Sequence, residues 1–243
     1  MANSYFQFKQ FTIHQDRCAM KVTTDGCLFG AFVSRETASC KTKAKRVLDI
    51  GTGTGLLSLM LAQQNQFPVD AIEIDKDTFE QASQNAAASK WTDRVKIYHG
   101  DAKDFKFPCK YDVIISNPPF YENELKGENP KKNMAHHNES LHLGELLSII
   151  KKNLAPGGSF YLLLPYKRNE EIKRLFTEKE LAIWQVILVK QSVLHDYFRI
   201  IVKGKSDAGN QSEISIDEIA IKNESNQYTT SFINLLKDYY LHL

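Results

Sequence analysis

Long apolar runs, a secretion signal and paired cysteines are all missing from this 243-residue sequence. No run reaches the roughly 18 apolar residues that a membrane span needs. The first residues lack a basic start followed by an apolar stretch, so we expect no signal peptide. None of the four cysteines stands in a CxxC pair. They therefore predict free thiols in a cytoplasmic protein.

A strong net charge is missing as well. The 31 Lys and Arg residues nearly balance the 29 Asp and Glu residues, which leaves a net charge of +2. No overall field attracts a polyanion, so any nucleic-acid surface must be a local patch. His136 and His137 are adjacent but have no third ligand at a sensible spacing, and we expect no metal.

From about residue 45, short β-branched runs alternate with amphipathic helical runs, which predicts an α/β domain with a mostly parallel sheet. We expect seven strands, at 46–50, 69–74, 95–98, 111–116, 159–164, 183–190 and 197–203. The last two are too close for a helical crossover and should pair antiparallel. This arrangement, with helices on both faces and one antiparallel strand, is that of a Rossmann-like class I methyltransferase.

The other predicted elements complete a single domain over 1–243. We expect helices at 56–65, 77–89, 141–154, 168–180 and 229–240, and a last strand-like stretch at 214–221. The domain then has an N-terminal extension at 1–44, which covers the cofactor and RNA side. A core at 45–205 follows, and a C-terminal strand and helix at 206–243 end the chain.

A glycine-rich loop follows the first core strand. Gly51, Gly53 and Gly55 follow Asp49 in the pattern Asp-x-Gly-x-Gly-x-Gly, and Leu56 breaks the dinucleotide pattern GxGxxG. That departure argues against a nicotinamide or flavin oxidoreductase. Glycines here permit unusual dihedral angles and close backbone contact. We expect the loop and Asp49 to lie near the methionine part of S-adenosylmethionine.

Two more acids end the next two strands. Glu73 lies at the end of the second strand, where a carboxylate can accept hydrogen bonds from both ribose hydroxyls, and Asp101 follows the third, near the adenine amine. Either acid alone could be a helix cap. Together with Asp49 and the glycine loop, they predict a binding site for the methyl donor.

Asn117-Pro118-Pro119-Phe120 directly follows the fourth strand. An adenine amine is a poor nucleophile, and acceptors for its hydrogens would turn its lone pair toward a methyl group. The Asn117 side-chain oxygen and the Pro118 carbonyl can supply them, while the prolines stiffen the turn. Phe120 offers a face for stacking a planar base. The motif predicts methylation of a planar amine without separating adenine, guanine and a side-chain amide.

The N-terminal segment resembles that of the bacterial adenosine-N6 methyltransferases that modify a valine tRNA beside the anticodon. It carries Phe-Lys-Gln-Phe at 8–11, His-x-x-Arg-Cys-Ala-Met-Lys-Val at 14–22 and Thr-Asp-Gly at 24–26. The resemblance covers nearly the whole chain, including 49–55, 115–120 and 228–243. It implies donor contacts from Lys21, Thr24 and Asp25.

The sequence departs from this family pattern at two positions. Thr23 stands where Gly is usual, and Phe120 where Tyr is common. Phe120 keeps the stacking face and loses only a hydroxyl. The helix that follows the segment is expected to be capped by Thr24 or Asp25.

Basic residues after the core strands are the candidate RNA contacts, because ligands of a parallel sheet bind beyond the carboxyl ends of its strands. These candidates are Lys126, Lys131, Lys132, Lys167, Arg168 and Lys190. Arg46 stands at the start of the first strand, at the opposite edge, and belongs to a solvated face.

Together these features predict a cytoplasmic, monomeric enzyme that uses S-adenosylmethionine to methylate N6 of an adenosine in tRNA. The valine tRNA and the position next to its anticodon are implied by the resemblance. Alternative acceptors are a ribosomal guanine or adenine, a DNA adenine, or a glutamine amide in a release factor. A different alternative is an RNA-binding scaffold without catalysis, against which the complete glycine loop and Asn117 argue.

Overall fold

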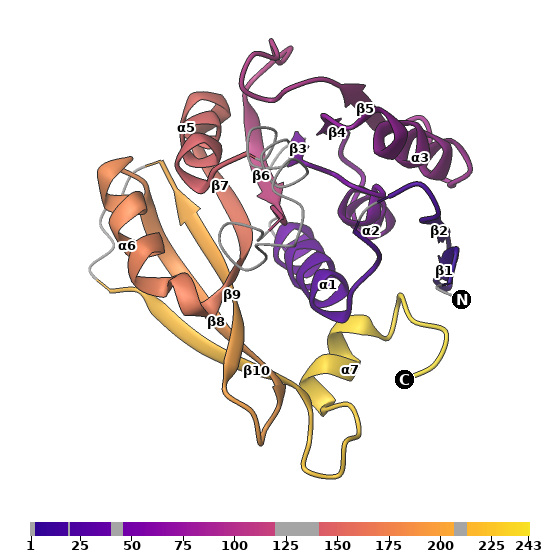
Figure 1. Cartoon of the computed structure of the whole chain (residues 1–243), viewed down its shortest axis with the longest axis vertical. Coiled ribbons are helices and arrows are strands. Elements are labelled where there is room, and N and C mark those ends of the chain that lie inside the picture. The colour runs from indigo at the N-terminus through magenta and orange to yellow at the C-terminus, as the bar shows by residue number, and fades with distance from the viewer. Residues whose placement is uncertain (1–2, 19, 40–45, 120–140, 207–212) are drawn as a thin grey trace, which may run out of the picture.

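The computed structural model describes residues 3–18, 20–39, 46–119, 141–206 and 213–243, and Figure 1 shows the course of the chain. Several predicted site residues lie outside these ranges, namely Phe120, Lys126, Lys131 and Lys132.

An eight-stranded sheet runs through the described part of the domain. In spatial order its strands are β10 (Ser215–Lys222), β8 (Ala182–Ser192), β9 (Tyr197–Lys205), β7 (Leu154–Pro165), β6 (Tyr111–Ser116), β3 (Val47–Ile50), β4 (Val69–Glu73) and β5 (Val95–His99). Strand β9 is antiparallel to both of its neighbours, and every other adjacent pair is parallel. The predicted seven strands with one reversed are confirmed.

The eighth strand is β10, which comes from the stretch predicted at 214–221. It pairs in parallel with β8, with Ile219 opposite Val189, and so extends the sheet beyond the predicted seven strands. The sequence predicted a strand-like stretch here, but a local pattern does not select the strand with which it pairs.

Helices cover both faces of the sheet, as predicted (Figure 1). On one face lie α1 (Thr24–Ser39), α2 (Leu56–Gln64), α3 (Lys76–Ala87) and α7 (Thr230–Leu236). On the other lie α5 (Leu143–Asn153) and α6 (Asn169–Glu178), which follows the short 3-10 helix η1 (Tyr166–Arg168). None of the described helices is long and apolar enough to cross a bilayer.

The central strands have buried side chains on both faces. Val47 packs into the core under α1 and α2, and its neighbour Leu48 packs into the core under α5. Val113 and Ile114 on β6 divide in the same way. This double burial explains why the strands are nearly continuous apolar runs without polar alternation.

The two ends of the chain meet beside α1. The N-terminal hairpin consists of β1 (Tyr5–Gln7) and β2 (Thr12–His14), and the C-terminal residues contact it. The Lys9 amide donates a hydrogen bond to the Tyr239 carbonyl at 2.8 Å. Tyr240 forms an isolated β-bridge with Phe8. Helix α7 therefore ends at Leu236, four residues before the predicted end, because Tyr239 and Tyr240 turn away to reach the hairpin.

Gly204 on β9 provides a test of how tightly the sheet is packed. It lies opposite Phe160 on β7, and an added Cβ would stand 2.2 Å from Phe160 Cζ and 2.5 Å from the Ala182 carbonyl oxygen. Gly204→Ala should lower the free energy of unfolding by about 1–3 kcal/mol, because the extra methyl overpacks the site. Urea unfolding measures the change.

Gly144→Ala is the matched control. Its Cβ would meet only Leu175, at an ordinary 3.8 Å, and it lies in helix α5. Alanine favours a helix over glycine by up to about 1 kcal/mol, so this variant should be neutral or stabilised. Equal stabilities for the two variants would contradict the packing at Gly204.

Candidate active site

The glycine loop lies between β3 and α2, and its backbone has a conformation that only glycine adopts readily. Gly51, Gly53 and Gly55 have φ values of +69°, +57° and +83°. A Cβ at Gly51 or Gly53 would meet nothing within 4 Å, so the loop borders open space at both positions. At Gly55 the nearest contact would be Ala82 on α3, which allows that helix to approach. The left-handed dihedral angles expected of the loop are present.

Asp49 supports this loop from beneath. Its side chain is fully buried, and Oδ2 accepts hydrogen bonds from the hydroxyls of Thr52 (2.7 Å) and Ser58 (2.8 Å). The other oxygen, Oδ1, is buried and has no hydrogen-bond partner among the described residues. Burial raises the pKa of the carboxyl to about 6, against the lowering effect of the two hydroxyls.

Glu73 connects the loop to the neighbouring strand. Its Oε2 accepts from the Gly53 amide at 2.9 Å, and its Oε1 accepts from the amides of Ile74 and Asp75 at 3.0 and 3.1 Å. The carboxylate is thus fixed at the carboxyl end of β4, beside the open side of the loop. This is the location that the sequence predicted.

Asp101 lies in the turn after β5, on the same edge as Glu73. Its Oδ1 accepts from the Lys103 amide at 2.9 Å, and Lys103 Nζ lies 3.5 Å from Oδ2. Ile74 directly follows Glu73 and is 46% exposed, although it comes after a buried strand. An exposed apolar side chain next to a carboxylate gives this edge a surface suited to a flat ring. Sequence reasoning missed Ile74, although its position directly after Glu73 was a usable signal.

Asn117 stands at the end of β6, adjacent to β3. Its side-chain Oδ1 is buried and has no hydrogen-bond partner among the described residues. Pro118 is buried and Pro119 is exposed. A buried amide oxygen without a partner costs free energy, so its retention points to an acceptor for an incoming donor group.

The first turn of α1 packs against this asparagine. Gly26 approaches so closely that a Cβ there would be 3.7 Å from Asn117 Nδ2 and 3.1 Å from Thr23 Oγ1. Thr23 Oγ1 accepts from the Gly26 amide at 3.2 Å, which makes Thr23 the helix cap. The predicted cap at Thr24 or Asp25 was wrong, because the helix begins one residue earlier than expected.

The other predicted contacts of this segment have protein partners or face solvent. Asp25 Oδ2 accepts from Arg199 Nε on β9 at 2.9 Å, and Lys21 Nζ donates to the Asn3 carbonyl at 3.3 Å. Thr24 is exposed. Sequence reasoning missed Arg199 and Gly26. A single arginine inside the apolar run of β9 was the available signal.

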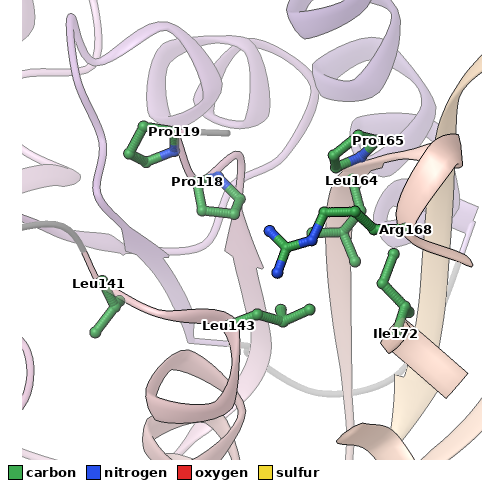
Figure 2. Close-up of a pocket in the computed structure, with 8 residues that line it drawn as sticks. All are labelled: Pro118, Pro119, Leu141, Leu143, Leu164, Pro165, Arg168 and Ile172. Atoms are coloured by element: carbon green, nitrogen blue, oxygen red, sulfur yellow. The ribbon is translucent and has the colours of Figure 1, made fainter. Parts of the chain in front are cut away.

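A pocket opens beside the two prolines (Figure 2). Its lining is apolar except for one guanidinium group and consists of Pro118, Pro119, Leu141, Leu143, Leu164, Pro165, Arg168 and Ile172. The Arg168 guanidinium points toward Pro118 and Leu143, and it is paired with Glu171 through two hydrogen bonds of 2.8 Å. These bonds hold the pKa of Glu171 below its ordinary value.

The remaining predicted RNA contacts that the structure describes lie at the same edge of the sheet. Lys190 is near the carboxyl end of β8, where its Nζ is 3.3 Å from Glu218 and lies over the Tyr197 ring. Its hydrogen bond to Glu218 raises its pKa. Lys167 is in η1, next to the pocket residue Arg168. Arg46 is at the opposite edge, where its amide donates to Asp112.

Comparison with known proteins agrees with this geometry. The methyltransferase small domain family matches residues 36–178. The tRNA1(Val) (adenine(37)-N6)-methyltransferase of Dyadobacter fermentans is 38% identical over 98% of both chains, and that of Parabacteroides distasonis is 37% identical over 100% of both. A solved structure from Listeria monocytogenes, assigned to the class I S-adenosylmethionine-dependent methyltransferases, matches with a TM-score of 0.61 at 17% identity. That match covers 82% of this chain and 68% of the other.

The fold and the site define a class I S-adenosylmethionine-dependent methyltransferase. More narrowly, similarity over the full length places the chain in the tRNA1(Val) (adenine(37)-N6)-methyltransferase family. The fold class, the family and the donor expected from the sequence are confirmed.

The residues present fit S-adenosylmethionine. The open sides of Gly51 and Gly53 leave room for a ligand against the backbone, and the second oxygen of Asp49 is a buried acceptor that has no partner among the residues described. Glu73 and Asp101 place two further carboxylates at the ends of the next two strands. When bound, the donor supplies an electrophilic methyl group on a sulfonium.

The raised pKa of Asp49 has a consequence for stability. Because the folded-state pKa of about 6 exceeds the ordinary value of 3.8, this carboxyl stabilises the fold most below pH 4. That stability is lost as the pH rises through 6. Asp49→Asn cannot ionise, so it does not lose this stability. Between pH 4 and 7, the free energy of unfolding of the variant minus that of the wild type should therefore increase by about 3 kcal/mol.

Urea unfolding of both proteins across this pH range checks the prediction. Ser58→Ala, which removes one of the two hydroxyl donors to Asp49, should move the transition to higher pH. A stability difference that does not change with pH would contradict a raised pKa.

Proposed function

We propose that this protein transfers the methyl group of S-adenosylmethionine to N6 of an adenine in tRNA, next to the anticodon of a valine tRNA. The observation that carries the proposal is the buried Oδ1 of Asn117, which has no hydrogen-bond partner in the described ranges and lies at the end of the strand adjacent to the glycine loop. Relatives that match over the full length carry that activity in their names.

The chemistry follows from what the amine needs. The lone pair of an adenine amine is delocalised into the ring, so it must be turned toward the sulfonium methyl before it can attack. Asn117 Oδ1 and the Pro118 carbonyl accept the two amine hydrogens and impose that orientation. The C–N bond forms as the C–S bond breaks, and the nitrogen becomes acidic enough to release its proton without a strong base.

We place a base removed from its stack beside Pro118 and Pro119, at the apolar pocket. Its walls are proline, leucine and isoleucine side chains, against which a flat ring can pack, and the Arg168 guanidinium points toward Pro118 and Leu143. A single-stranded anticodon loop lowers the cost of exposing a base, which is a few kcal/mol in a duplex. Phe120 belongs to the same proposal as a stacking face.

Basic residues that follow or end the core strands in the sequence support an RNA acceptor. We assign the phosphate contacts to Lys126, Lys131, Lys132, Lys167, Arg168 and Lys190, all of which follow or end core strands on that side. The net charge of +2 requires such a local patch, because the molecule as a whole does not attract RNA. The same proposal includes a monomer that works in the cytoplasm.

Labelling tests the acceptor directly. Incubation with radiolabelled S-adenosylmethionine and total tRNA from a strain without this enzyme should give labelled N6-methyladenosine in the tRNA, with the label mapping beside the anticodon of a valine tRNA. Ribosomal RNA, DNA and release factor in parallel reactions are the controls. Label in one of these and none in tRNA would refute the proposed acceptor, and donor binding without any transfer would favour a scaffold.

Asn117→Ala should separate donor binding from transfer. Loss of the amide oxygen should lower kcat on the order of 100-fold or more, because the amine is no longer oriented. Affinity for S-adenosylmethionine, measured by calorimetry, should change by less than about threefold, well under 1 kcal/mol. Asn117→Asp keeps an acceptor oxygen and should recover part of the rate. Near-normal turnover by the alanine variant would remove Asn117 from the mechanism.

A further inference from the structure

Two ion pairs join helix α1 to strand β9. Arg199 Nε lies 2.9 Å from Asp25 Oδ2, and Lys203 Nζ lies 2.7 Å from Glu36 Oε2. Both pairs are half-buried, with side-chain exposures of 26% and 12% in the first and 24% and 28% in the second. They connect the same two elements but at opposite ends of the helix.

Only the first pair is next to the active site. Asp25 is in the first turn of α1, and its neighbour Gly26 faces Asn117 Nδ2 and Leu56 Cδ2, each 3.7 Å from where a Cβ would be. Leu56 is the first residue after the glycine loop. The turn that Asp25 holds therefore packs against both the asparagine and the end of the donor loop.

Both oxygens of Asp25 are used within the protein. Oδ2 accepts from Arg199, and Oδ1 accepts from the Gly26 amide at 3.1 Å. A carboxylate bound in this way fixes the turn between a distant strand and its own backbone. The resemblance to the family implied a donor contact for Asp25, whereas these bonds give it a role in holding the turn.

Arg199 also lies close to the other side of the site. In the register of the sheet it is opposite Pro165, which lines the pocket beside Pro118 and Pro119. Arg199 is thus the backbone register partner of a pocket residue, and its side chain binds the first turn of α1.

We propose that Arg199 is a positioning residue for methyl transfer: by holding Asp25, it keeps the first turn of α1 packed against Asn117 and the end of the glycine loop. Loss of the pair lets this turn move away, which loosens the donor site and the orientation of Asn117. The inference rests on the proposed function for its effect on transfer, but its effect on donor binding is independent of the acceptor.

The test compares Arg199→Met with Lys203→Met, because each removes one cation of a matched pair between the same elements. Both should lower the melting temperature by similar amounts. Only Arg199→Met should weaken S-adenosylmethionine binding by calorimetry and lower kcat, each roughly tenfold, as expected for a displaced positioning group. Arg199→Lys, which can still reach Asp25, should recover part of both losses.

Asp25→Asn and Glu36→Gln form a second matched set that keeps the shape of each side chain, for use if a methionine variant does not fold. The same split is expected, with donor affinity reduced only by Asp25→Asn. Equal losses of stability with unchanged donor affinity and kcat at Arg199 would overturn the proposal. A wild type that binds the donor but leaves tRNA unmethylated would refute only the acceptor, because donor affinity still tests Arg199.

Discussion

The parallel pairing of β3 with β4 on one side and β6 on the other decides where every functional group lies. Parallel neighbours end at the same edge, so the glycine loop after β3, Glu73 at the end of β4 and Asn117 at the end of β6 are brought together. These residues are far apart in sequence. A reversed β6 would carry Asn117 to the opposite edge, so the site depends on the direction of this one strand.

Two buried oxygens at this edge, on Asp49 and Asn117, have no hydrogen-bond partner within the described part of the chain. Each lowers the stability of the ligand-free protein, and contacts to other atoms of the two side chains hold them in place. Thr52 and Ser58 fix the other oxygen of Asp49, and the first turn of α1 packs against the Asn117 amide. The fold thus keeps two acceptors oriented before any ligand is bound. Such preorganisation lowers the entropic cost of reaching the reactive geometry.

Sequence patterns predicted most of the core because its strands are buried on both faces and its turns carry glycine or proline. The glycine loop, both strand-end acids and Asn117 were located because each directly follows a strand, where local order fixes the position. Arg199 and Gly26 were missed for the converse reason. Their partners, Asp25 and Asn117, are distant in sequence, and no local pattern reports a contact between residues 25 and 199.

Thr23 shows how a departure from a family pattern can be accommodated. Glycine is usual at this position in the pattern that the N-terminal segment resembles. The hydroxyl of Thr23 accepts a hydrogen bond from the Gly26 amide and so caps the helix. A glycine has no side chain to do this, and the amide would bond to water instead. Its hydroxyl occupies space beside Gly26, where an added Cβ would be only 3.1 Å away. Thr23 and Gly26 therefore form one unit: the hydroxyl stabilises the start of α1, and the missing side chain at Gly26 lets that start approach Asn117.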